Sequence, residues 1–241
     1  MKVLDCRGKH YREINATLEQ LWREGVQEVV LQGVNGQRYL GRGLWRGEIV
    51  IEGIPGDDLG MFLNGATIRV RGNAQDGVGN TMNMGKIIVE GDARDIVGFS
   101  MRGGKIFIRG DVGYRVGIHM KSYLDEYPVI VFGGQSGDFL GEYMAGGLIV
   151  VLNLAHRKPV EGSFVASGMH GGKILIRGEL DRRFLGAGIK MEKTTEEDWN
   201  GVVHYLQEYC QDLNLPFTFS SEEFVSIAPL TTRPYGKIYV Y

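Results

Sequence analysis

The chain has 241 residues, with 27 Lys or Arg against 29 Asp or Glu, so its formal net charge is −2. This balance gives no general attraction to nucleic acid, and every apolar run is far shorter than the roughly 20 residues that span a membrane. Because only two cysteines are present, Cys6 and Cys210, and the first residues contain no apolar leader segment, we expect a cytoplasmic protein with reduced thiols.

Glycine is unusually frequent, with 37 residues, and it recurs in two series with steps of 19 residues. A fixed period of this size predicts a chain built from stacked repeats. Because glycine reaches positive φ without steric cost, we interpret these residues as structural turn glycines; a phosphate-binding loop would need a helix start after it. The turn glycines are Gly53, Gly60, Gly72, Gly79, Gly91, Gly98, Gly110 and Gly117.

The first predicted element is a helix over residues 11–24, followed by Gly25 in the place where glycine commonly ends a helix. Its apolar residues share one helical face: Ile14, Leu18, Leu21 and Trp22. The first repeat of a stacked array needs a cover over its apolar interior, so we expect residues 1–27 to form an N-terminal helical cap.

Eight short strands are predicted next, one in each repeat. They are Glu28–Gln32, Glu48–Glu52, Thr67–Arg71, Lys86–Glu90, Lys105–Arg109, Pro128–Phe132, Leu148–Leu152 and Lys173–Arg177. The second and fourth residues of every strand are aliphatic, which is the alternation of a strand with one buried face. Stacking the strands in parallel would give a continuous interior. The expected fold class is therefore an all-β solenoid, a parallel β-helix of about eight 19-residue coils over residues 28–190.

The outward-facing residues of these strands are also mostly apolar, above all in the sixth and seventh repeats. Such a face is rarely left exposed on a monomer, so either the tails of this chain or a partner protein should cover it. An insertion after the seventh strand adds a positive patch, and insertions in repeat proteins often carry recognition. The candidate partner face consists of Ile130, Phe132, Leu148, Val150, Leu152, His156, Arg157 and Lys158.

Thr195 and the three acidic residues after it predict the start of a second short helix, whose apolar spacing continues to Leu213. The rest of the chain has two apolar stretches broken by Pro229 and Pro234, and we expect it to run over the repeats as an irregular cover. Residues 191–241 are thus predicted to be a C-terminal helix and covering tail.

The residues that could carry chemistry are scattered or have a structural explanation. The five histidines lie on five segments without metal-ligand spacing. A column of turn aspartates, with Arg94 and Arg115 nearby, could bind a cation or a small ligand, but aspartate commonly bonds the backbone of its own turn, and we favour that interpretation. We therefore predict no catalytic, cofactor-binding or metal-binding residue in this chain. The turn aspartates are Asp57, Asp58, Asp76, Asp92, Asp95, Asp111 and Asp138.

The repeated glycine pattern, in stretches such as Asn73–Ala93 and Gly137–Asn153, resembles the C-terminal GXGXG domain of the large subunit of glutamate synthase. One subunit of formylmethanofuran dehydrogenase shares this domain. Three further segments resemble the stand-alone, archaeal-type glutamate synthase subunit most closely: Asn35–Gly41, Ser100–Lys121 and Arg233–Tyr241.

This resemblance implies a right-handed β-helix that acts as a scaffold and contains no catalytic residue. The function it implies is a structural subunit of a glutamate-synthase-type complex, an oxidoreductase that transfers the amide of glutamine to 2-oxoglutarate. The implied partners are a glutamine amidotransferase subunit and an FMN-dependent synthase subunit, which would hold the FMN and the iron–sulfur clusters, and a homo-oligomer is also compatible. Residue 2 is Lys, not the nucleophilic cysteine of the amidotransferase domain, which agrees with this division.

Two alternatives stay open at this point. The chain could be the scaffold of a formylmethanofuran dehydrogenase or an N-methylglutamate synthase-like complex. It could also be a β-helix that binds a small ligand through its turn Asp and Arg columns.

Overall fold

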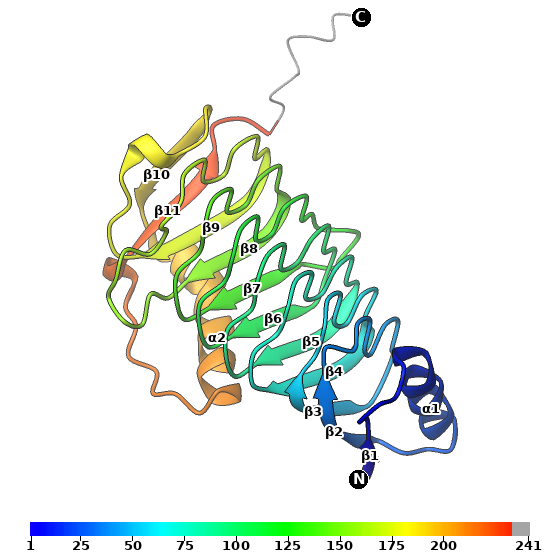
Figure 1. Cartoon of the computed structure of the whole chain (residues 1–241). Coiled ribbons are helices and arrows are strands. Elements are labelled where there is room, and N and C mark those ends of the chain that lie inside the picture. The colour runs from blue at the N-terminus through cyan, green and yellow to red at the C-terminus, as the bar shows by residue number, and fades with distance from the viewer. Residues whose placement is uncertain (233–241) are drawn as a thin grey trace, which may run out of the picture.

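The structure is a computed structural model that describes residues 1–232 and consists of one 11-stranded mixed sheet with two α-helices (Figure 1). The strands are β1 (Lys2–Asp5), β2 (Glu28–Asn35), β3 (Glu48–Ile54), β4 (Asn64–Arg71), β5 (Met84–Val89), β6 (Lys105–Ile108), β7 (Val129–Phe132), β8 (Ala145–Val151), β9 (Gly171–Arg177), β10 (Ile189–Lys193) and β11 (Phe224–Pro229). The helices are α1 (Tyr11–Arg23) and α2 (Glu196–Asp212), with short 3-10 turns at Arg182–Phe184 and Ser221–Glu223. The strands from β1 to β9 are parallel neighbours in chain order, and the sheet ends with β11 and then β10, both antiparallel to their neighbours.

A column of isoleucines fixes the register of the parallel strands. In every strand from β3 to β9 an isoleucine pairs with the isoleucine of the next strand, and all of them are fully buried. β-branched side chains pack well on a pleated surface, and a slip of one residue would turn the whole column outward. The column consists of Ile49, Ile68, Ile87, Ile106, Ile130, Ile149 and Ile174.

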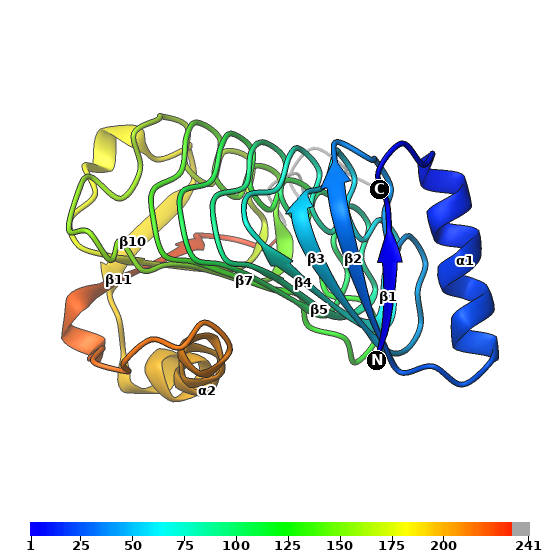
Figure 2. The same ribbon diagram turned by 60° about the horizontal axis from the view of Figure 1, so that its bottom comes forward.

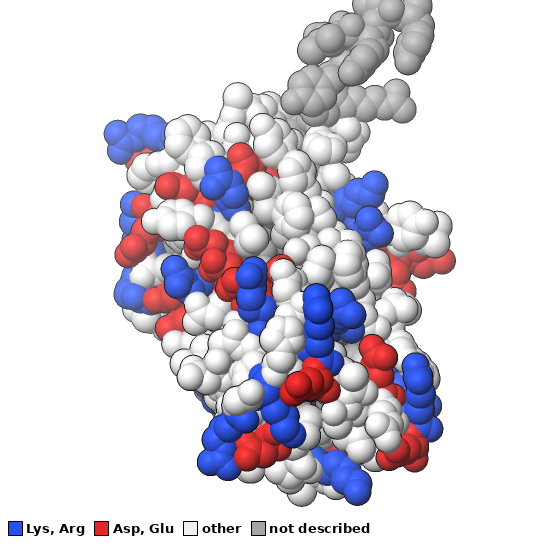
Figure 3. All heavy atoms as spheres, turned by 45° about the vertical axis from the view of Figure 1, so that its right-hand side comes forward, with Lys and Arg blue, Asp and Glu red and all other residues white. Residues whose placement is uncertain are grey.

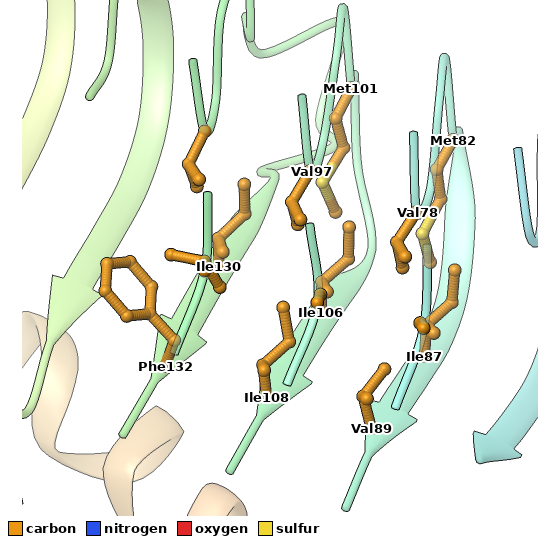
Figure 4. Packing of buried hydrophobic residues seen from close by; sticks show 14 of the residues in the cluster. Val78, Met82, Ile87, Val89, Val97, Met101, Ile106, Ile108, Ile130 and Phe132 are labelled. Carbon is orange, nitrogen blue, oxygen red and sulfur yellow. The ribbon is translucent and has the colours of Figure 1, made fainter. Parts of the chain in front are cut away.

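The core lies between this sheet and a second layer made of the turns that connect the strands. Figure 4 shows Val78 and Met82 from one turn, and Val97 from the next, pointing toward Ile87 and Ile106 of the sheet. These side chains are completely buried. Each repeat therefore supplies one strand and one turn to the same apolar interior.

A glycine in each turn allows the two layers to approach closely. Gly60 has a φ of +67°, and a Cβ there would lie 2.6 Å from Cδ1 of Ile87. Gly41 and Gly117 stand in the same relation to Ile68 and Ile149. Glycine is needed at these positions for two reasons, the left-handed backbone and the lack of space for a side chain.

The helix α1 closes the first end of the core. Ile14, Leu18 and Trp22 are buried in the main hydrophobic cluster, at most 1% exposed. Asn15 fixes the helix to the first turn, because its side-chain amide donates to the carbonyl of Tyr39 (2.8 Å) and its side-chain oxygen accepts from the amide of Gly41 (3.0 Å). The predicted helix over residues 11–24 is confirmed.

The helix α2 lies on the other face of the sheet (Figure 2). Leu206 and Tyr209 belong to a second buried cluster with Phe107, Val131 and Val150 of the sheet. The Tyr209 hydroxyl donates to the carbonyl of Ile108 (3.0 Å), and its ring meets that of Phe107 edge-on, with ring centroids 5.7 Å apart. Thr195 caps the start of the helix as predicted, since its side chain accepts from the amide of Asp198.

Ion pairs hold the polar edge of α2 to three neighbouring strands. The carboxylate of Glu208 lies 2.5 Å from Nζ of Lys86 and 2.6 Å from Nζ of Lys105, and that of Asp212 lies 2.7 Å from Nζ of Lys86 and 3.7 Å from Nη2 of Arg69. Burial alone would raise the pKa of Glu208, but the hydrogen bonds from Lys105 and Lys86 outweigh it and leave the pKa below its ordinary value.

The predicted all-β solenoid, a right-handed parallel β-helix, is wrong. Each repeat contributes a single strand, and the rest of the repeat is turns, so the strands join into one sheet that does not close. The last two strands of that sheet also run antiparallel to their neighbours. The helices of 13 and 17 residues are substantial parts of the fold. The boundaries proposed at residues 27 and 190 stay predictions.

The prediction for the sixth repeat strand is wrong by one residue. Ile130 and Phe132 face the core, paired with Ile106 and Ile108, whereas Val129 and Val131 were expected there. The predicted strand began at Pro128, but proline has no N–H group and cannot donate a hydrogen bond to the neighbouring strand. The pairing therefore begins one residue later, where the amide of Val129 donates to the carbonyl of Gly104 (3.0 Å).

The predicted irregular tail is also wrong in part. Residues Phe224–Pro229 form the regular strand β11, which is inserted between β9 and β10. The strand pairs with both neighbours through its backbone, and Phe224 and Ile227 are buried. The segment Arg233–Tyr241, used in the family resemblance, lies outside the described residues.

We expect Gly60→Ala to lower the free energy of unfolding by about 2–4 kcal/mol, from left-handed strain plus overpacking against Ile87. The matched control is Gly43→Ala, where φ is +66° but nothing lies within 4 Å of the added Cβ; it should lose only about 1 kcal/mol. Urea unfolding measures both. Equal losses would show that packing against the isoleucine column is unimportant.

We expect Glu208→Gln to lower the free energy of unfolding at neutral pH by about 1–3 kcal/mol. Because the folded-state pKa of Glu208 is depressed, its contribution is present above the unfolded-state pKa and is lost as the pH falls through the folded-state pKa. The variant should therefore lose less stability than the wild type on acidification, which unfolding curves at several pH values would measure. Glu192→Gln, which breaks an exposed pair with Lys190, serves as the control and should change stability by less than about 0.5 kcal/mol. A loss for Glu208→Gln that is the same at acidic and neutral pH would contradict this account.

Candidate interaction surface

The apolar half of the predicted partner face is buried in this structure. Ile130 and Phe132 belong to the main core, and Leu148, Val150 and Leu152 lie in the cluster beneath α2, all at most 1% exposed. The sequence left open whether the tails of this chain or a partner protein cover this face of the sheet. In the structure, α2 of this chain covers it. Leu148, Val150 and Leu152 are therefore inaccessible to a partner while α2 is in place, and Ile130 and Phe132 are inaccessible because they face the main core.

The positive half of that face is an exposed loop with internal partners. Nη2 of Arg157 lies 2.6 Å from Oδ1 of Asp111, and Nζ of Lys158 lies 4.6 Å from the ring centroid of Phe184. Burial raises the pKa of Asp111, but the hydrogen bonds from Arg157 and from the amide of Gln135 outweigh it, so that the pKa is lowered. The exposed residues His156, Arg157 and Lys158 are thus separated from the apolar residues with which they were grouped.

The turn aspartates form ladders of hydrogen bonds to the backbone. Oδ1 of Asp92 accepts from the amide of Asp111 (2.9 Å), and Oδ1 of Asp111 accepts in turn from the amide of Gln135 (2.9 Å). A second ladder runs in parallel, with Oδ1 of Asp95 accepting from the amide of Tyr114 (2.9 Å). Each of these carboxylates satisfies a donor of the following repeat, which is the structural role that the sequence favoured.

Three residues in each turn adopt a left-handed conformation, two positions apart. The middle residue of the three is the glycine that faces the isoleucine column, except in the last turn. The residues two positions before and two positions after it are often not glycine. In the fifth repeat these flanking residues are Arg115 and His119, and in the sixth they are Phe139 and Tyr143. Phe164 follows in the next turn, with a φ of +62°. Holding a bulky residue at positive φ costs about 1–2 kcal/mol.

These flanking side chains stack into a surface that we call the aromatic ridge, made of Arg115, His119, Phe139, Tyr143 and Phe164. The rings of Phe139 and Phe164 are parallel within 10° and 5.0 Å apart, and those of His119 and Tyr143 are parallel within 9° and 5.3 Å apart. The guanidinium of Arg115 lies 4.5 Å from the ring centroid of Phe139. Tyr143 is 43% exposed and Phe164 is 55% exposed.

This ridge was not predicted from the sequence, in which His119 stands as an isolated histidine and the glycines account for the turns. The available signal was the residue type two positions before and after the second glycine series, such as Phe139 and Tyr143 around Gly141. Aromatic residues there are unexpected, because glycine or asparagine would adopt the same backbone with less strain.

A hollow of about 350 Å³ lies close to the ridge. Its polar lining includes Asp111, Gln135, Asp138 and Glu161, and Tyr114 contributes a ring that is 52% exposed. Asp138 accepts from the amide of Ser163 (2.5 Å), and Glu161 accepts from the side chain of Gln135 (3.3 Å). These polar groups are thus already bonded to neighbouring turns.

Both cysteine thiols are free and buried. Burial raises the pKa of the Cys6 thiol to about 11, and it also raises that of Cys210. Within residues 1–232, no group of three His, Cys, Asp or Glu side chains is placed to hold a metal ion. No helix in this part of the chain is long and apolar enough to cross a membrane. The face drawn in Figure 3 mixes positive and negative side chains with uncharged surface.

The fold and its turns define a class of repeat protein. In this class each repeat supplies one strand to a parallel sheet and one left-handed turn, whose glycine packs against the core. The chain belongs to the GXGXG motif family, whose family model matches residues 23–220, and this confirms the family expected from the sequence. It is 47% identical over 249 aligned residues to the uncharacterized protein MJ1350 of Methanocaldococcus jannaschii, with 98% of this chain and 95% of the relative covered.

A solved structure shares the fold. It is a chain of the formyltransferase/hydrolase complex (FhcABCD) from Methylorubrum extorquens, crystallised with methylofuran; the TM-score is 0.59 and the sequence identity is 22%. The match covers 79% of the present chain and 68% of the other. At this identity the likeness is one of fold.

We expect Phe164→Asn to leave the free energy of unfolding within about 1 kcal/mol of the wild type. Asparagine tolerates the left-handed backbone, and this gain offsets the loss of the exposed stack on Phe139, worth about 0.5–1.5 kcal/mol. Phe62→Asn is the control, because Phe62 has the same backbone conformation and is 46% exposed; it should stabilise slightly. A loss of several kcal/mol for Phe164→Asn in chemical denaturation would mean that the ridge is a structural element.

Proposed function

We propose that this chain is a non-catalytic scaffolding subunit of a glutamate-synthase-type complex. In that complex glutamine would supply the amide that is transferred to 2-oxoglutarate, and the chemistry would take place in partner subunits. Membership of the GXGXG motif family supports this function, since the family resemblance implies a scaffold. The observation that carries the proposal is the aromatic ridge, an ordered exposed surface on this fold.

The ridge supports docking because stability does not explain its composition. Tyr143 and Phe164 are large, exposed and held at positive φ, where smaller residues would be less strained. Aromatic residues and arginine are enriched at the energetically important centres of protein interfaces. The ridge combines three aromatic rings with Arg115 and His119 on rigidly stacked turns, which limits the entropy lost on binding.

The ladders of the turn aspartates support a structural role for the residues that could otherwise bind a ligand. Asp92 and Asp95 accept from backbone amides of the following repeat. Glu208 and Asp212 of α2 are likewise engaged with lysines of the sheet. We assign glutamine hydrolysis to an amidotransferase subunit, and the FMN and iron–sulfur clusters to an FMN-dependent synthase subunit.

A second candidate function is the corresponding scaffold of a formyltransferase/hydrolase-type complex, such as that of formylmethanofuran dehydrogenase. The specific observation in its favour is the fold shared with a chain of the FhcABCD complex. Both candidates assign the same scaffolding role to this chain, and they differ in the partners that it would hold.

Affinity purification of the tagged chain from its native cells, at moderate salt and with partners identified by mass spectrometry, tests the proposal. We expect recovery of an amidotransferase subunit and an FMN-binding synthase subunit. The double variant Tyr143→Asn/Phe164→Asn should reduce their recovery at least tenfold, as expected from losing about 1.4 kcal/mol or more of binding energy.

The control is Phe217→Asn, which removes an aromatic side chain that is 39% exposed and lies outside the ridge; it should leave recovery unchanged. Recovery of formyltransferase or molybdenum or tungsten subunits would instead support the second candidate. A chain that is recovered alone would overturn the scaffold proposal, and partners retained by the double variant would show that the ridge is not the docking surface.

A further inference from the structure

A second hollow lies at the N-terminal end of the chain, remote in sequence from the aromatic ridge. It is an open depression of about 730 Å³ between the segment that joins β1 to α1 and the end of β2 with the turn that follows it. Its lining is formed by Arg7, Gly8, Lys9, His10, Tyr11, Gly33, Asn35, Gly36, Gln37 and Arg38. Three of these residues are permanent cations, one is histidine, and none of the ten is acidic. The lining is therefore basic, although Asp5 and Asp57, which lie outside it, pair with two of its cations.

The cations retain capacity for a ligand. Among the residues that the structure describes, Lys9 makes no ion pair, and it is exposed. Arg7 is held by Asp5 through Nε (3.0 Å) and Nη2 (2.8 Å), which leaves Nη1 free of that carboxylate. Nη2 of Arg38 lies 3.2 Å from the carboxylate of Asp57, and the side chain of Arg38 is 53% exposed.

The two walls of the hollow are fixed to each other before any ligand binds. The side-chain amide of Gln37 donates to the carbonyl of Cys6 (2.9 Å), and its oxygen accepts from the amide of Asn35 (2.6 Å). A Cβ at Gly33 would lie 2.5 Å from Cγ of Arg7, so glycine there allows the arginine stem to lie directly on the turn. A prearranged site of this kind loses little entropy when it binds a ligand.

The chemistry of the lining selects the class of ligand. We propose that this hollow binds a small polyvalent oxyanion, with Lys9 and Arg38 as the principal cations and Arg7 as a third. Phosphate esters and polycarboxylates both carry the required charge, and the volume lies within the about 300–1,000 Å³ usual for small-molecule sites. Tyr11, the first residue of α1, also lines the hollow, so the positive end of the helix dipole adds to the attraction.

Binding here would connect the helical cap to the first turn of the repeats. Lys9 belongs to the segment that leads into α1, whereas Arg38 belongs to the turn between β2 and β3. An anion held by both would oppose separation of α1 from the core that it covers. The proposal does not depend on the function of the complex and would hold for an isolated chain.

Thermal unfolding of the full chain with pyrophosphate or with citrate, at constant ionic strength, tests this site, and calorimetric titration gives each Kd. We expect at least one anion to raise Tm by about 3–6 °C when it is present at ten times its Kd. The variant Lys9→Gln/Arg38→Gln should bind that anion at least about tenfold more weakly. Preference for pyrophosphate would identify phosphate esters as the ligand class, and preference for citrate would identify polycarboxylates.

The matched control is Lys121→Gln/Lys193→Gln, which removes the same charge from two exposed lysines elsewhere and should bind the anion as the wild type does. Circular dichroism and the Tm without ligand establish that both variants fold. The proposal is overturned if neither anion binds, if Lys9→Gln/Arg38→Gln binds as tightly as the wild type, or if the control weakens binding equally.

Discussion

The contact between the left-handed turn glycines and the isoleucine column sets the spacing of the two layers, and the rest of the structure depends on it. A side chain larger than hydrogen at Gly60 would overlap Ile87, and Gly141 has the same relation to Ile174. The contact recurs although the repeats differ in length, since Gly117 meets Ile149 across the repeat that contains the insertion after Lys121. Inserted residues are thus confined to the surface, where they do not disturb the interior.

This constraint also determines what the surface can present. Because the middle residue of each turn is left-handed and points inward, its neighbours two positions away are left-handed and carry their side chains outward. Successive turns then place Phe139 next to Phe164 and His119 next to Tyr143. The exposed rings are therefore stacked because the contact between glycine and isoleucine in the core fixes the position of each turn. Its residue types can vary without changing the fold.

The sequence was sufficient where the information was local and periodic. The alternation in strands such as Lys105–Ile108 and the glycine series identified the repeats, the inward residues and the family. It was insufficient where one proline shifted the register of β7, since the apolar residues on both faces of that strand gave no means of distinguishing them.

Long-range contacts were the other part that could not be predicted. The cover of the sheet by α2 depends on pairs such as Lys105 with Glu208, which are 103 residues apart in the chain. A single open sheet also could not be distinguished from a solenoid, because the pattern reveals which residues are strands but not whether the turns between them add further sheets. The aromatic ridge was missed for a related reason, as stacking across turns is a property of neighbouring repeats.

The charged edge strand β10 has a consequence for self-association. A ladder of parallel strands has no intrinsic end, and its last edge could accept the first strand of another molecule, which would lead to fibres. Because β11 is antiparallel to β9 and β10 is antiparallel to β11, β10 runs in the same direction as the parallel strands, and strand direction alone would not stop a further copy. The exposed side chains of Lys190, Glu192 and Lys193 instead make this edge charged. Charges on an edge strand disfavour pairing with another chain, and they keep a periodic sequence in the form of a discrete molecule.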